Sequence, residues 1–286
     1  MPHETKRTRY PKLFHLLAVA ILTAGSFLLI TALLVLPSTW ADGDNMTESD
    51  EIISWENTEF FQLSPNPTEL NQAKTKAFVL PVPYIGTVTQ AQLVLATNNV
   101  DRDYFPILVN GESIANVQMG GPHECDPDIV TEYPITPTLI HPGPNSLTLT
   151  QEPSSDSWNV CYMAIRVSGT DLTGSDFVFT QFPGENDQPV DTELLIPRNQ
   201  AEPSPLLVLF HGWKGRLIDP YLTDYTTATV DRQWFVGSPQ QRGQNALGPG
   251  GQPLASLKSQ HDAIKFIDYM VANYPIDPDR IYVGGF

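Results

Sequence analysis

The hydrophobic pattern of the chain begins with one long apolar run. Residues 13–36 carry no charge and follow a basic flank that contains Lys6, Arg7, Arg9 and Lys12. As a helix, this run would be about 36 Å long, enough to cross a hydrocarbon core of about 30 Å. The pattern predicts a transmembrane anchor or a signal peptide within residues 1–41, and the basic flank predicts that its amino-terminal side stays in the cytoplasm.

The length of the run favours a retained anchor, because the apolar core of a signal peptide is usually about 7–15 residues long. Thr39-Trp40-Ala41 has the small-x-small pattern of a signal-peptide cleavage site, so cleavage after Ala41 is the alternative. Both alternatives predict that the bulk of the protein is exported, either membrane-anchored through residues 13–36 or secreted. Residues 42–56 are rich in acids and poor in apolar residues, which predicts a solvated linker.

Residues 57–169 show short β-branched and aromatic runs in place of a helical period. Turn residues separate the runs, and Asn110-Gly111 is typical of a two-residue hairpin turn. The pattern predicts an all-β sandwich, jelly-roll-like, with eight strands. The expected strands are Glu59–Leu63, Ala77–Val82, Ala91–Ala96, Phe105–Val109, Ile114–Val117, Ile129–Tyr133, Leu147–Thr150 and Val160–Val167.

Residues 170–286 have a different pattern. Leu206–Phe210 is a continuous apolar run, as expected of a strand covered on both faces, and Trp234–Pro239 is a second one. Leu257–Tyr274 has the apolar spacing of an amphipathic helix, and Ile281–Val283 begins another buried strand. The order predicts part of a three-layer α/β/α domain with a mostly parallel sheet.

Composition restricts the function. The 286 residues include 16 Lys and Arg against 32 Asp and Glu, a formal net charge of -16, which excludes a nucleic-acid binder that works by neutralising phosphates. Cys125 and Cys161 are the only cysteines, and in an exported protein they are candidates for a disulfide, with two buried thiols as the alternative. No metal and no cofactor is expected.

A specific resemblance rests on the carboxyl-terminal part of the chain. The order is strand, His211-Gly212 loop, strand, helix, then Asp277-Pro278-Asp279-Arg280-Ile281-Tyr282-Val283. It resembles the exported esterase, depolymerase and prolyl-oligopeptidase-like branches of the α/β-hydrolase superfamily. The resemblance implies that Gly285 and Phe286 begin the nucleophile elbow and that the catalytic serine comes next. The acid and the histidine of the triad would follow it in the chain, so we expect this sequence to be an incomplete hydrolase that lacks the triad.

The same resemblance assigns roles to the loop after the strand that ends at Phe210. It implies that the backbone N–H of Trp213 donates to the oxyanion of the reaction, that Gly212 permits a tight turn, and that His211 supports the loop. The function it implies is hydrolysis of an ester bond, with a peptide bond as second choice, through a serine acyl-enzyme.

The phrases PILVNGESI and HPGPNSLTLT resemble the galactose-binding-like jelly rolls that accompany secreted hydrolases. This resemblance implies a carbohydrate ligand, and the alternative is a structural spacer that binds nothing. Trp158 and Tyr162 are the candidates for stacking on a sugar, although both also fit a core position. A rival interpretation of the whole chain is a non-catalytic cell-surface protein that binds carbohydrate or protein and carries a vestigial hydrolase half.

Overall fold

The computed structural model describes residues 51–101, 105–120, 125–151, 157–200, 202–212, 215–241 and 257–285. They all fall within one compact unit that begins at Met46. The expected anchor at 13–36, the cleavage point at Ala41, Trp213 and Phe286 lie outside the described residues. Among the helices of these ranges, none has the length and apolar character needed to cross a membrane.

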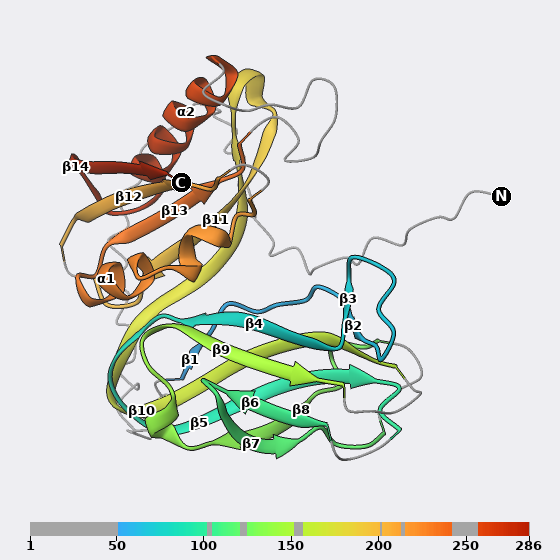
Figure 1. Cartoon of the computed structure of the whole chain (residues 1–286). Coiled ribbons are helices and arrows are strands. Elements are labelled where there is room, and N and C mark those ends of the chain that lie inside the picture. The colour runs from blue at the N-terminus through green and yellow to red at the C-terminus, as the bar shows by residue number, and fades with distance from the viewer. Residues whose placement is uncertain are drawn as a thin grey trace, which may run out of the picture. The chain divides into compact units, whose positions relative to one another are not determined.

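The first region consists of two β-sheets (Figure 1). A four-stranded sheet has the order β4-β9-β6-β7, and the strands β1, β2, β3, β5, β8 and β10 belong to the other sheet. Each of the eight expected runs overlaps a strand. The elements are β1 (Ile52–Ile53), β2 (Phe61–Leu63), β3 (Gln72–Ala73), β4 (Thr75–Val82), β5 (Tyr84–Asn98), β6 (Pro106–Val109), β7 (Glu112–Asn116), β8 (Thr131–Ile135), η1 (Pro137–Leu139), β9 (Gly143–Thr150) and β10 (Trp158–Pro183).

One hydrophobic cluster joins these two sheets. Leu147 and Leu149 of β9 and Leu93 and Leu95 of β5 are buried in it, at alternate positions along their strands. Successive side chains of a strand point to opposite faces, so this alternation places one face of each sheet against the shared core. The region therefore buries apolar surface from both sheets in a single core.

The turn between β6 and β7 has the expected form. Asn110 and Gly111 have φ angles of 50° and 88°, the positive values that a type I′ turn requires at both central positions. The Asn110 side chain also donates to the carbonyl of Leu139 (2.7 Å) and accepts from the N–H of Ser146 (2.8 Å). This asparagine thus ties the hairpin to β9.

The expectation of a solvated linker was wrong for residues 51–56. Ile52 is fully buried, and β1 pairs antiparallel with Arg166 and Val167 of β10. The Ser54 N–H donates to the carbonyl of Ile165 (2.8 Å). The acidic residues of this segment obscured the apolar pair Ile52-Ile53 in the sequence. Ile52 contributes one buried side chain to the core, and the pair forms a short strand beside β10.

The expected boundary between residues 169 and 170 falls inside a strand. Strand β10 pairs with β5 as far as Gly174 and with β11 (Pro189–Pro197) from Ser175 onward, without a break (Figure 1). The same strand therefore pairs first with β5 and then with β11, so no loop separates the two regions at this point.

The second region is a sheet with helical segments on both faces. Along the sheet the order is β14-β12-β13-β11-β10; β12 is parallel to β13 and β14, whereas β11 is antiparallel to its two neighbours. The further elements are η2 (Glu185–Asp187), β12 (Ser204–Phe210), η3 (Asp219–Leu222), α1 (Tyr225–Asp231), β13 (Phe235–Pro239), α2 (Leu257–Asn273) and β14 (Ile276–Gly285).

Consecutive residues of these strands belong to different cores. Leu194 packs in the cluster that contains Phe266 of α2, and Leu195 packs in the cluster that contains Tyr221 of η3. Both faces are therefore covered, which explains the continuous apolar runs in β12 and β13. The Phe266 ring lies directly on Gly237 of β13 and leaves no room for a Cβ atom there.

Strand β14 does not fit the expectation of a buried strand. Tyr282 is 46% exposed and Val283 is 63% exposed, and Ile276 is the strand's only residue in the buried class. In the part of the chain that the structure describes, β14 pairs with β12 alone, so its other side has no neighbouring strand. An apolar run at a sheet edge remains accessible even where the sequence suggests burial.

Candidate active site

Three parallel strands end at one edge of the second sheet. Phe210, the last residue of β12, pairs in register with Gly285, the last residue of β14. Val208 of β12 likewise pairs with Gly237 near the end of β13. Because carboxyl ends of parallel strands meet at one edge, the loop that begins at His211 lies beside the point where β14 ends, and ligands of open α/β sheets bind at such edges. The structure thus brings the two sequence-predicted parts of the site together.

His211 is held inside this edge, with 3% of its surface exposed. Its Nδ1 lies 3.1 Å from the carbonyl oxygen of Gly212, and its Nε2 lies 3.5 Å from the side-chain nitrogen of Gln240. Both contacts are satisfied when the proton is on Nδ1, so that Nε2 accepts from the amide. The Gln241 side chain donates to the His211 carbonyl (2.9 Å). Both ring nitrogens therefore have local partners, which suits a supporting role.

A tight turn follows His211. The Gly215 N–H donates to the carbonyl of Gly212 (2.9 Å). A Cβ atom at Gly215 would lie 2.9 Å from that same oxygen and 3.0 Å from Cβ of His211, so the turn closes too tightly for a side chain. Trp213, the expected oxyanion donor, stands between these glycines and lies outside the described residues, as does Phe286. The described residues on the two sides of Trp213 are His211 and Gly212 before it and Gly215 and Arg216 after it.

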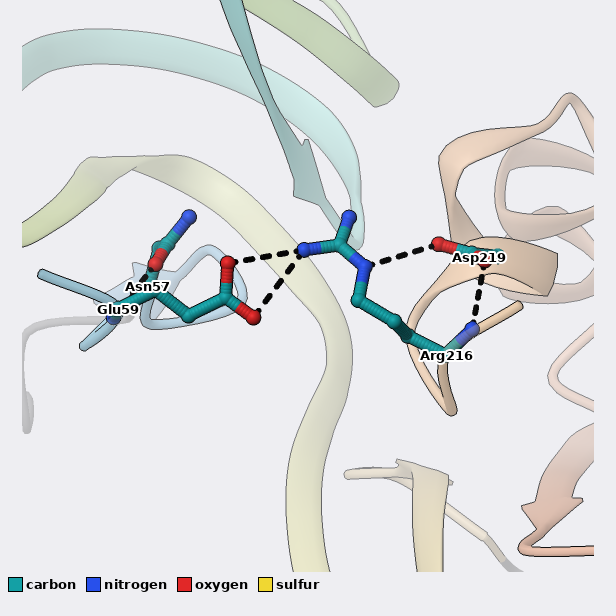
Figure 2. Close-up of polar contacts among 4 residues, drawn as sticks. All are labelled: Asn57, Glu59, Arg216 and Asp219. Carbon is teal, nitrogen blue, oxygen red and sulfur yellow. Dashed lines mark hydrogen bonds and ion pairs between the residues drawn. The ribbon is translucent and has the colours of Figure 1, made fainter. Parts of the chain in front are cut away.

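An ion-pair chain anchors the far end of the loop (Figure 2). The Arg216 guanidinium donates to both carboxylate oxygens of Glu59 (3.2 and 3.0 Å) and to Asp219 (3.2 Å), whose other oxygen accepts from the Arg216 N–H (2.6 Å). Glu59 belongs to the first region, and its own N–H donates to the Asn57 side chain (2.8 Å). One arginine therefore fixes the end of the loop to a residue of the β-rich region.

Sequence reasoning missed most of this support. The glutamines after β13 and the Glu59–Arg216 pair are ordinary polar residues in the sequence, and their partners are 29 to 157 positions away. The spacing of Arg216 and Asp219 was the one local signal, because an acid three residues after an arginine is within reach in a helical turn.

Sequence reasoning also missed a buried carboxyl group. Glu193 of β11 is 6% exposed, and burial raises the pKa of its carboxyl group to about 7, although a hydrogen bond with the Trp55 side chain opposes the rise. The Tyr221 hydroxyl donates to the Glu193 carbonyl (2.6 Å), and burial raises the pKa of that phenol as well. Glu193 stands between Thr192 and Leu194 in the sequence, and nothing there marks it as unusual.

The remaining candidates lie in the first region. Cys125 and Cys161 are joined in a disulfide, with a Cα–Cα distance of 5.6 Å, inside the usual range. Trp158 is 1% exposed and stacks on Phe105. Tyr162 is 9% exposed, and its hydroxyl donates to Glu56 (2.7 Å). Both aromatics are core residues, so neither offers a face to a sugar.

The geometry of the second region supports a coarse assignment. Its helical segments on both faces and its His-Gly loop at the carboxyl edge agree with the expected three-layer architecture. In the described residues, β12 is parallel to β13 and β14, whereas β11 is antiparallel to β10 and β13. Within the described ranges, no group of three or more His, Cys, Asp or Glu side chains is placed to hold a metal ion.

Comparisons with known proteins give structural likeness only. No family model matches the sequence, and no curated protein matches it. Among solved structures, it is similar to an acetyl xylan esterase from Paenibacillus sp. R4 (18% identity, 40% of this chain and 45% of that one, TM-score 0.31). It is also similar to an acylaminoacyl peptidase from Pyrococcus horikoshii (17%, 39% and 19%, TM-score 0.33) and to a bacterial heroin esterase (26%, 41% and 37%, TM-score 0.31).

The chain spans less than half of the length of each of these three proteins. The structural neighbours include esterases, a dienelactone hydrolase and peptidases. With TM-scores below 0.5, the likeness carries no argument about the chemistry of this chain.

Proposed function

We propose that this chain is the first part of an exported serine hydrolase that cleaves an ester bond, with a peptide bond as second choice. The observation that carries the proposal is the register of Phe210 with Gly285, which sets the His211-Gly212 loop beside the end of β14. The nucleophilic serine is expected directly after Phe286, at the same edge.

The chemistry follows from this placement. Attack of a serine hydroxyl on an ester carbonyl forms a tetrahedral intermediate with negative charge on oxygen, and fixed backbone N–H groups stabilise that charge by about 3–4 kcal/mol each. The Trp213 N–H is the first proposed donor, and the residue after the serine supplies the second. The hydrogen bond between Gly215 and Gly212 and the ion pair of Arg216 with Glu59 support the proposal, because they fix described residues on both sides of Trp213.

His211 is not the proposed general base. Its Nδ1 faces the Gly212 carbonyl and its Nε2 faces the Gln240 amide, so no ring nitrogen is directed at a serine in the arrangement described. In the order typical of this fold, the acid and the base follow the nucleophile in the chain. We therefore place both of them after Phe286.

The test compares this chain with a protein that continues beyond Phe286. The continuing protein should contain Ser-x-Gly directly after Phe286 and should hydrolyse p-nitrophenyl acetate, while the 286-residue chain should not. Replacing the serine by alanine in the continuing protein is the matched control and should abolish turnover. A different residue at the position after Phe286 would contradict the proposal.

The proposed location is outside the cytoplasm, with residues 13–36 as a membrane anchor. A reporter enzyme fused after Phe286 should be active outside the cytoplasm, since the basic flank orients the run. Alkaline carbonate washing should leave the protein with membranes. Recovery of a soluble form that begins at Asp42 would instead show cleavage after Ala41.

The β-rich region is proposed as a structural support. Because Trp158 and Tyr162 are buried, the aromatic basis for a carbohydrate ligand is absent at those two positions. The contact between Glu59 and Arg216 gives the region a role in fixing the catalytic loop. No described contact favours the rival in which the chain is only a surface binding protein.

A further inference from the structure

A pocket formed by residues 53–56 of the first region and by the second region shares no lining residue with the His211–Arg216 loop. It has a volume of about 350 Å³, which lies at the lower end of the range for small-molecule sites. Four segments contribute its walls: residues 53–56, β10, β11 and the residue after β11. The lining residues that matter here are Trp55, Glu56, Phe177, Phe179, Glu193 and Arg198.

The pocket wall contains the buried carboxyl group of Glu193, which has few partners that could stabilise its ionised form. The Trp55 side chain is the hydrogen-bonding partner that the structure gives to the Glu193 carboxyl group, and an ionised carboxylate accepts about four hydrogen bonds. In the described part of the chain, no Lys, Arg or His lies within 4.0 Å of it. A buried charge is costly unless it is paired, so burial favours the protonated form of this group, and a cation bound beside it would favour the ionised form.

The other charges at the pocket are already engaged or are negative. Arg198 pairs with Asp176 (2.7 Å) and donates to the Glu51 carbonyl (2.6 Å), so these contacts engage its guanidinium with groups other than Glu193. Glu56 accepts from the Tyr162 hydroxyl (2.7 Å) and adds a second carboxylate to the wall. The pocket therefore offers negative charge that the protein itself does not balance.

Three aromatic rings share the same walls. Phe179 is 65% exposed, and Phe177 is held edge-on against Tyr221 with the ring centroids 5.3 Å apart. Together with Trp55, they line the pocket that Glu56 and Glu193 also line. Aromatic faces attract the alkylated groups of organic cations, and carboxylates balance the charge.

We propose that this pocket binds an organic ammonium cation, with Glu193 and Glu56 as counter-charges and Trp55, Phe177 and Phe179 around its alkyl groups. An uncharged ligand of the same shape would contact the rings but would gain nothing from the charge of the carboxylates. This difference separates a charged from an uncharged ligand in an experiment.

Binding should depend on pH, because Glu193 must lose its proton to balance the cation. Burial sets the pKa of this carboxyl group at about 7. It is faced by Glu56 from the amino-terminal segment, Asp176 from β10, Arg198 after β11 and Tyr221 from η3. Apparent affinity scales with the ionised fraction, which is about 0.1 at pH 6 and about 0.9 at pH 8, so a permanent cation should bind about tenfold more tightly at pH 8.

The experiment is calorimetric titration of the 286-residue chain in maltoside micelles with choline. Choline should bind about tenfold more tightly at pH 8 than at pH 6, and 3,3-dimethylbutan-1-ol, its uncharged analogue in shape, should bind at least tenfold more weakly than choline at pH 8. Equal binding of the two compounds, or no binding of choline, would overturn the proposal.

Two variants and one control keep the test decisive. Glu193→Gln should weaken choline binding at pH 8 and remove the pH dependence, whereas Glu132→Gln, an exposed carboxylate on β8 that pairs with Arg166, should change neither. Phe179→Ala removes an exposed ring with little effect on folding and should weaken binding several-fold. Unchanged binding in both Glu193→Gln and Phe179→Ala would also overturn the proposal.

Discussion

The two regions of the molecule bury their apolar surface in different ways. In the first region, both sheets contribute to one cluster, which includes Leu93 and Leu147. In the second region, a single sheet supplies two smaller clusters, one on each face, and its strand β14 remains open along one side in the described residues. The first region shares one core between its sheets, whereas the second depends on layers added to both faces and has an accessible edge.

This difference has a consequence for function. The accessible strand β14 is the one whose end meets the His211-Gly212 loop. The candidate active site thus lies at the carboxyl ends of β12 and β14, and the β-rich region contacts its loop through Glu59 and Arg216. The following predictions compare the two regions, beginning with the largest expected effect.

The largest effect is expected from a buried aromatic of the first region. Trp158→Ala should lower the free energy of unfolding by about 3–5 kcal/mol, because Trp158 is 1% exposed and stacks on Phe105. Tyr282→Ala in β14 should cost much less, since Tyr282 is 46% exposed. Urea denaturation of both variants measures the difference, and equal costs would contradict the contrast between core and edge.

Removing the disulfide should cost about 3–4 kcal/mol. Cys125 and Cys161 are 36 positions apart, and closing a loop of this length restricts the unfolded chain by that amount on the loop-entropy estimate. The double variant Cys125→Ser/Cys161→Ser should unfold at correspondingly lower urea concentration. Alkylation of the unreduced, denatured wild-type protein should label no cysteine, and labelling of both would show that the bond is absent.

Deprotonation of Glu193 should lower the free energy of unfolding by about 3 kcal/mol as the pH rises. The pKa of its carboxyl group is about 7 in the folded state and 4.5 in the reference state, so between these values the folded state binds more protons. Its stabilising contribution is complete below pH 4.5 and is lost through pH 7, at about 1.36 kcal/mol per pH unit. Glu193→Gln should remove this dependence, and Glu132→Gln should retain it.

The smallest effect on stability is expected at the loop anchor. Glu59→Gln should cost about 0.2–1 kcal/mol, because the ion pair with Arg216 is largely exposed and such pairs contribute little. Hydrogen exchange should nevertheless show faster exchange at Gly215 and Arg216, since the loop loses its contact with the first region. Unchanged exchange there would mean that Asp219 alone holds Arg216.

Local patterns were sufficient to predict most of the strands and the helix α2. The eight runs of the first region and the apolar runs of β12 and β13 all overlap strands, because alternation and continuous burial leave a direct mark on the sequence. Asn110-Gly111 is the clearest case, since its turn needs positive φ angles at both positions. The order of strand, His-Gly loop, strand and helix was visible for the same reason.

Long-range partners decided what the sequence did not reveal. Ile52 is buried because β10 lies beside it, and Tyr282 is exposed because β14 has one neighbouring strand in the described chain. Short polar segments gave no sign that Gln240 would meet His211, or that Trp55 would meet Glu193. These contacts depend on the packed sheet and have no local signal.

Covalent labelling of the nucleophile tests the central claim most directly. A protein that continues beyond Phe286 should react with a fluorophosphonate, and mass spectrometry of its peptides should place one phosphonate on the serine directly after Phe286. The label should be lost when that serine is replaced by alanine, and the 286-residue chain should take up none. A label on any other residue, or an unlabelled protein that still hydrolyses esters, would contradict the assignment of this sheet edge as the active site.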